Sequence, residues 1–228
     1  MSVKIIADST CDLSKDLLEK YDISVLPLHI VLGDKEYKDG LEISPDEIYE
    51  WSNANKEAPK TSAAAISDTI DIYSKYLKSY DEIICFSISG QMSTTVNVMR
   101  MAAEELDAED TIHIIDSENL STGGGLLVIE AAIMAKEGKT ANEIVETMNQ
   151  LKPFVRASFI VDTLTFLHRG GRCSGVAALA GGALKLHPLI SVIDGKMLPG
   201  KKYRGKMNRV IIEYVKDMEE ELKLAKTD

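Results

Sequence analysis

The stretch EIICFSI at residues 82–88, with SGQMSTT after it at residues 89–95, decides the fold. The first part is a short apolar run, which predicts a buried strand. The second part is a loop of small and hydroxyl-bearing residues, and it leads into an expected helix at residues 96–106. A buried strand that enters a helix in this way is typical of a parallel sheet with helices on its faces.

The same alternation of strand and helix recurs along the first two thirds of the chain. Further apolar strands are expected at residues 3–7 and 111–115, and an apolar run at residues 23–32 followed by Gly33-Asp34 predicts a hairpin. Helices are expected at residues 14–21, 44–53, 67–77, 126–137 and from 140 onward. Because parallel sheets bind ligands beyond the carboxyl ends of their strands, three loops are candidates for a site. These loops are residues 8–12, 87–95 and 116–125.

The pattern changes after Lys152-Pro153. Short β-like runs at residues 154–161, 189–193 and 197–198 alternate with an expected helix at 163–167 and an amphipathic one at 210–222. The sequence therefore predicts two α/β domains, the larger at residues 1–152 with a mostly parallel sheet and helices on both faces, and the smaller at residues 153–228.

Composition excludes several classes of protein. The chain has 228 residues and a formal net charge of -10, which argues against a general nucleic-acid binder. No apolar run reaches the length of a membrane span, so we expect no stable membrane insertion. The three cysteines form no metal-binding or disulfide pattern, and we expect no metal and no cofactor. No signal peptide precedes the first strand, which favours a cytoplasmic protein.

Hydroxyl side chains gather in two places. One is the loop before the helix at residues 96–106, with Ser93 and Thr94, and the other is Thr61-Ser62, followed by three alanines. Hydroxyls and the free N–H groups of a helix N-terminus can hold a carboxylate or a phosphate with neutral donors. The alternative is ordinary helix capping, for which one such residue would suffice.

Basic residues concentrate in the second domain. Arg169 and Arg172 flank two glycines, and six lysines and arginines with no acid lie between residues 196 and 209. This concentration indicates either a surface that recruits an anionic ligand or acidic partner, or a solvated basic loop.

Three glycines at residues 123–125 precede the expected helix at 126–137. They do not form a GxGxxG fingerprint or a P-loop, and they favour close packing of the backbone against a ligand or the neighbouring domain. No Ser-His-Asp arrangement can be assembled from the sequence.

In this ordered set of motifs the chain resembles the DegV family of bacterial fatty-acid-binding proteins. The motifs that carry the resemblance are IADSTCD at 6–12, VLPL at 25–28, YKDG at 37–40, PKTS at 59–62, SIS at 87–89, STT at 93–95, DS at 116–117, GGGLL at 123–127, LHRGGR at 167–172 and HPLI at 187–190.

The resemblance implies a two-domain DegV-like fold with a long-chain fatty acid in a cleft between the domains. It implies that Thr61 and Ser62, with Ser93 and Thr94, hold the carboxylate. It also implies a carrier without catalysis of its own, which presents the fatty acid to a separate fatty-acid kinase for acyl-phosphate formation in phospholipid metabolism. Typical members continue past residue 228, so we expect the C-terminal part of the usual family domain to be missing.

The expected docking surface for the kinase consists of Arg169, Arg172, Lys201, Lys202 and Arg204. Two alternatives remain open. One is a hydrolase or phosphotransferase that acts at the serine-rich loop with Ser93 or with Asp8, and the other is an interaction module that binds no lipid.

Overall fold

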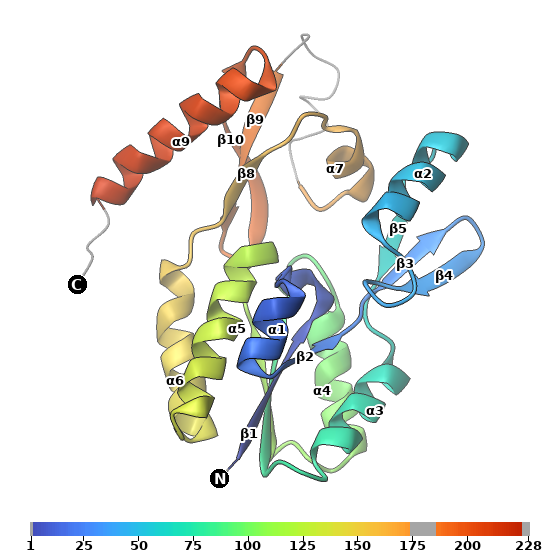
Figure 1. Ribbon diagram of the computed structural model, residues 1–228, viewed down its shortest axis with the longest axis vertical. Coiled ribbons are helices and arrows are strands. Elements are labelled where there is room, and N and C mark those ends of the chain that lie inside the picture. Colours follow the sequence, from blue (N-terminus) through green and yellow to red (C-terminus); the bar gives the residue numbers. More distant parts are fainter. Residues whose placement is uncertain (1, 174–185, 225–228) are drawn as a thin grey trace. The chain divides into compact units, whose positions relative to one another are not determined.

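The computed structural model describes residues 2–173 and 186–224 (Figure 1). The chain divides into two compact units, Met1–Ala157 and Ser158–Asp228. The expected domain boundary after Lys152 stays a prediction, because the division into units does not test which parts fold independently.

Four parallel strands form the main sheet of the first unit. They are β1 (Val3–Asp8), β2 (Ile23–Leu26), β6 (Glu82–Ser87) and β7 (Ile112–Asp116). Their order is β2-β1-β6-β7, so the chain runs outward from β1 to β2 and later returns to the other side of β1. The expected parallel sheet is confirmed, and its topological switch point lies between β1 and β6.

Helices cover both faces of this sheet, as Figure 1 shows. On β1 the side chain of Ile5 packs into one core and that of its neighbour Ile6 into the other, because successive strand residues point to opposite faces. The first core contains residues of α5 and α6, and the second contains residues of α3 and α4. The helices of the unit are α1 (Lys15–Tyr21), α2 (Pro45–Asn55), α3 (Ile66–Tyr76), α4 (Thr95–Glu105), α5 (Ser121–Lys136) and α6 (Ala141–Leu151). Short 3-10 turns are η1 (Ser9–Cys11) and η2 (Lys152–Phe154).

A second, antiparallel sheet of the first unit has the order β4-β3-β5, and we call it the small sheet. Its strands are β3 (His29–Leu32), β4 (Lys35–Lys38) and β5 (Lys60–Ser62). The expected hairpin is correct for β3 and β4, but the apolar run at residues 23–32 does not form one strand. Its first part is β2 of the main sheet, and the run is divided at Pro27, which has no N–H for a strand ladder.

The glycines at residues 123–125 lie inside helix α5, which begins at Ser121 and therefore earlier than expected. A Cβ on Gly125 would lie 2.6 Å from the carbonyl oxygen of Cys11, and a Cβ on Gly123 would lie 2.3 Å from Oδ1 of Asn119. The backbone of these glycines is closely packed, but the expected partner was wrong: it is neither a ligand nor the neighbouring domain but the turns after β1 and β7 in the same unit.

The second unit has an antiparallel sheet of order β10-β9-β8. Its elements are β8 (Ser158–Ile160), α7 (Thr165–Gly170), β9 (Leu186–Ile193), β10 (Lys196–Arg204) and α9 (Met207–Leu224). The ring of His187 is buried and bonds the carbonyl oxygens of Val161 and Gly205. The expected smaller α/β part is confirmed.

Candidate functional site

A pocket lies at the carboxyl ends of β1, β6 and β7, where all three candidate loops meet. The pocket is small, because the centre of a water-sized sphere can occupy only about 10 Å³ of it, and it is partly open to solvent. Its lining residues are Ala7, Asp8, Thr10, Cys11, Phe86, Ser87, Ile88, Ser117, Asn119, Leu120, Ser121, Gly124 and Val128. The pocket therefore occupies the switch point at which open parallel sheets bind ligands.

Asp8 is the buried carboxylate of this pocket. Its Oδ1 accepts hydrogen bonds from the N–H and the hydroxyl of Thr10, at 3.1 and 2.6 Å, and its Oδ2 accepts one from the N–H of Ile88 at 2.7 Å. Burial raises the pKa of Asp8, although these hydrogen bonds act in the opposite direction. All these donors are uncharged, and no cationic side chain in residues 2–173 and 186–224 forms an ion pair with Asp8.

The loop at residues 87–95 ends at the N-terminus of α4. Ser93 Oγ lies 2.9 Å from Oγ1 of Thr95 and accepts a 3.2 Å hydrogen bond from the N–H of Thr95. Thr94 is the N-cap residue, but its side chain makes no capping hydrogen bond and it is exposed. The hydroxyl of Ser93 thus caps the start of α4, whereas the side chain of Thr94 is exposed to solvent.

Asp116 and Asn119 hold this loop to the end of β7. The carboxylate of Asp116 accepts hydrogen bonds from the N–H of Gly90, at 3.1 Å to each oxygen, and the carbonyl of Asn119 accepts one from Ser89 at 2.9 Å. Oδ1 of Asp116 also accepts a 2.9 Å hydrogen bond from the N–H of Glu118, so this carboxylate caps the turn after β7. Ser117 and Asn119 lie in the candidate loop at residues 116–125 but were not singled out as site residues, although Ser117 belongs to the DS motif.

Thr61 and Ser62 lie on β5, the edge strand of the small sheet. By register Thr61 pairs with Ile30 and Ser62 pairs with His29, so the two hydroxyls point to opposite faces of that sheet. The hydroxyl of Ser62 donates a 3.2 Å hydrogen bond to Oε1 of Glu36. Thr61 is exposed, and its hydroxyl bonds no other residue in the described part of the chain.

The four expected carboxylate ligands therefore form two separate pairs. Ser93 and Thr94 are adjacent at the start of α4, whereas Thr61 and Ser62 belong to the small sheet. A link from the small sheet to the pocket turn is made by Ser9, whose hydroxyl donates to Asp39 at 2.7 Å and accepts from the N–H of Leu28 at 3.1 Å.

The expected docking residues lie in the second unit, and they differ in whether an acidic side chain neutralises their positive charge. Nζ of Lys201 lies 2.6 Å from Oδ2 of Asp217 and 3.9 Å from Oε1 of Glu213, both on α9. Arg172 is exposed and donates to the carbonyl oxygen of Gly170. Lys202 and Arg204 are exposed on β10, and the side chain of Arg169 lies outside the described part of the structure.

Residues 2–173 and 186–224 lack three features that would indicate other functions. No group of three or more His, Cys, Asp or Glu side chains there is arranged to hold a metal ion. No helix in those ranges is long and apolar enough to span a bilayer. No histidine or carboxylate in them hydrogen-bonds Ser93, whose partner is Thr95.

Comparison with known proteins gives one consistent family. Residues 2–227 match the family described as "Uncharacterised protein, DegV family". A DegV domain-containing protein of Caldanaerobacter subterraneus subsp. tengcongensis is 35% identical over 217 residues, which are 94% of this chain and 77% of that protein.

Solved structures agree with this match. One, described as fatty-acid binding of a DegV family protein from Thermus thermophilus, has a TM-score of 0.80 and 30% identity, over 90% of this chain and 72% of that chain. Another, described as a stearic acid-binding protein from Eubacterium ventriosum, has a TM-score of 0.82 and 29% identity, over 96% of this chain and 78% of that chain.

The matches to a family and to relatives extend over nearly the whole chain, and the folds agree. The expected resemblance is confirmed, and this chain belongs to the DegV family.

Proposed function

We propose that this chain binds a long-chain fatty acid, holds its carboxylate with neutral hydroxyl and N–H donors, and presents it to a separate fatty-acid kinase. The observation that carries the proposal is the similarity, along 90% of the chain, to a Thermus thermophilus protein described by its fatty-acid binding. The stearic acid-binding relative supports a long acyl chain.

The acyl tail supplies most of the affinity in this proposal. A chain of about 14 methylenes gains roughly 11 kcal/mol on full burial, at ~0.8 kcal/mol each, and the loss of its freedom offsets a large part. The prediction that the tail lies in a cleft between the two domains stays a prediction.

The head group is assigned to Thr61 together with Ser93 and Thr94. Thr61 and Thr94 are exposed, and their side-chain hydroxyls have no hydrogen-bond partner among the described residues. Ser93 can donate its proton if Thr95 donates to it. Ser62 acts indirectly, because its hydroxyl proton is directed to Glu36. Neutral donors offset the cost of taking a carboxylate out of water and leave its oxygens accessible to a phosphoryl donor.

Docking of the kinase is assigned to the basic residues of the second unit. Lys202, Arg204 and Arg172 carry it, since Lys201 is already paired with acids of α9. Arg169 is included on its sequence position alone.

Native mass spectrometry of the purified protein tests the proposal. We expect a mass increase that matches a long-chain fatty acid, and its release on denaturation. Protein without lipid after expression in lipid-rich cells would contradict binding. Hydrolysis of acyl or phosphate esters without any partner protein would favour the alternative of a hydrolase or phosphotransferase at the serine-rich loop.

A further inference from the structure

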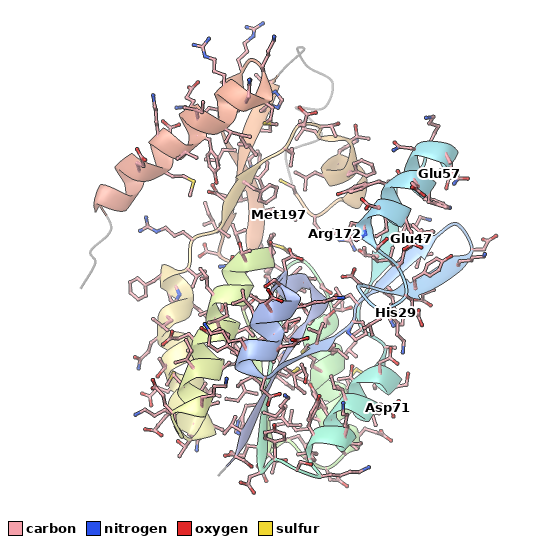
Figure 2. The ribbon with its side chains drawn as sticks, in the orientation of Figure 1. His29, Glu47, Glu57, Asp71, Arg172 and Met197 are labelled. Carbon is pink, nitrogen blue, oxygen red and sulfur yellow. The ribbon has the colours of Figure 1, made fainter. Side chains whose placement is uncertain are left out.

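A charged cluster joins the small sheet to helix α3. Nδ1 of His29 lies 2.9 Å from Oε1 of Glu36 on β4, and its Nε2 lies 3.1 Å from Oδ2 of Asp68 in α3. The other oxygen of Asp68 accepts a 2.7 Å hydrogen bond from Nζ of Lys38. Figure 2 shows His29 on the side of the small sheet nearest α3, the helix that carries Asp71. The side chain of His29 therefore links the small sheet to helix α3.

The geometry specifies the protonation state of the ring. Each nitrogen of His29 lies against a carboxylate oxygen, and ionised carboxylates only accept hydrogen bonds. A neutral imidazole has one N–H and can satisfy one of these two partners. Both contacts together thus require the imidazolium form.

The cluster also holds β5. Oε1 of Glu36 accepts from the Ser62 hydroxyl as well as from His29, and Ser62 lies directly opposite His29 in the ladder. Thr61, the adjacent residue, has its side chain on the other face of β5. Any shift of β5 therefore moves the hydroxyl of Thr61.

Charged groups surround His29 on each element packed against it. Those on its own face of the small sheet, by register, are Glu36 and Lys38 of β4 and Lys60 of β5, and the one beyond the sheet is Asp68 of α3. Glu42 and Asp71 act on the neighbouring Lys38. Burial alone would lower the pKa of His29, but its hydrogen bonds to Glu36 and Asp68 raise it overall.

We propose that His29, as an imidazolium, is a positioning residue that fixes β5 and so Thr61, and that retention of the fatty acid falls when His29 loses its proton. This inference rests on the proposed function. Because the raised pKa belongs to a base, the stabilising contacts are complete below the ordinary histidine pKa of about 6.5 and are lost as pH rises through the pKa of the folded protein.

The test compares three proteins after extensive dialysis at pH about 6 and about 9. For the wild type we expect roughly 3- to 10-fold less retained fatty acid at the higher pH, which corresponds to the net contribution of one ordinary hydrogen bond, because the neutral ring keeps one of its two contacts. His29→Gln is expected to retain little at either pH. His113→Gln is the matched control, since His113 is also a strand histidine but contacts one carboxylate, that of Glu82 at 3.0 Å, and it should follow the wild type.

A second variant and a second measurement keep the test decisive. Asp68→Asn keeps the side-chain shape and lets a neutral ring satisfy both contacts, so its retention should not change with pH. Hydrogen exchange at residues 60–62 should show weaker protection in the wild type at the higher pH, with or without lipid.

Two outcomes are distinguishable failures. Fatty acid retained equally at both pH values by the wild type and by His29→Gln would overturn the role of His29 and leave the proposed function intact. Protein that carries no fatty acid at any pH would overturn the proposed function itself, and with it this role of His29.

Discussion

Strand β1 carries a buried charged residue near each of its ends, and only one of the two contacts a group of opposite charge in the described part of the chain. Lys4 and Asp8 are both 2% exposed. Nζ of Lys4 bonds the carboxylate and the carbonyl oxygen of Asp22, at 2.7 Å each, and lies 4.7 Å from the ring centroid of Tyr76. Asp8 contacts uncharged donors beside an open pocket.

The two ends of β1 therefore differ in how a buried charge is matched. At the amino end a cation is matched by a carboxylate and by aromatic rings, as expected of a group that only stabilises the fold. At the carboxyl end a carboxylate accepts hydrogen bonds from neutral donors beside a small pocket whose lining is mostly apolar, and ligands of parallel sheets bind at that end. The predictions below test this division.

The largest effect is expected from Lys4→Ala. The substitution removes the cation and the packing of its stem, and we expect a loss of about 2–4 kcal/mol in the free energy of unfolding. Urea unfolding measures it. Lys4→Met keeps the stem and should recover most of the loss, because Asp22 is 62% exposed and stays hydrated. A loss below about 0.5 kcal/mol for Lys4→Ala would refute a structural role for this end.

Gly125→Ala tests the carboxyl end. Its Cβ would lie 2.6 Å from the Cys11 carbonyl and 3.0 Å from Leu13, so the turn after β1 must move, and we expect a loss of about 1–3 kcal/mol. Thermal and urea unfolding measure the change. Gly124→Ala is the control, since its nearest neighbour is Ser117 Oγ at 3.6 Å, and it should be neutral or gain up to ~1 kcal/mol of helix propensity. Equal effects of both would contradict the packing described.

Acid should affect the two ends with opposite signs. Burial raises the pKa of Asp8, so the folded state binds a proton more readily, and the stability of wild type relative to Asp8→Asn should increase as pH falls from about 7 to about 4. Burial would also raise the pKa of Asp22, but hydrogen bonds from Lys4 and Tyr80 lower it overall. The stability of wild type relative to Asp22→Asn should therefore decrease below pH about 4. The measurement is the free energy of unfolding of the wild type, Asp8→Asn and Asp22→Asn proteins across this pH range. If both differences from the wild type changed with pH in the same direction, the account would be contradicted.

The smallest effect is expected away from both ends. The hydroxyl of Tyr73 in α3 is buried and has no hydrogen-bond partner in the described part of the chain. Tyr73→Phe removes this unsatisfied group and should leave stability unchanged or raise it by up to ~1 kcal/mol. A clear loss in urea unfolding would show that the contact of this hydroxyl with the nearby thiol of Cys85 stabilises the fold.

The main sheet could be predicted from the sequence because its signals are local. Each strand is a short apolar run and each following helix has its own period, so the three ligand loops could be placed before the structure was known. Strand β5 was not predicted because its three exposed residues form no periodic pattern. The predicted hairpin at residues 23–32 was wrong in part, because residues 23–26 form β2 and pair with β1.

The contacts between distant segments could not be predicted. His29 meets Asp68 only after the small sheet has formed, and Lys201 meets Asp217 only when α9 packs on β10. The basic stretch at residues 196–209 is therefore less positive in the folded protein than its sequence indicates, because Asp217 pairs with Lys201. That Thr61 and Ser62 face opposite ways follows once β5 is known to be a strand.

The central claim is that hydroxyls on β5 and at the start of α4 hold a fatty-acid head group. It is tested most directly by native mass spectrometry of the Thr61→Ala/Ser93→Ala protein beside Thr147→Ala, whose hydroxyl bonds only its own helix. The account predicts normal loading in the control and retention at least roughly a hundredfold lower in the double variant, from the loss of two hydrogen bonds to a carboxylate at about 1.5 kcal/mol or more each. Equal loading of the two proteins would contradict it.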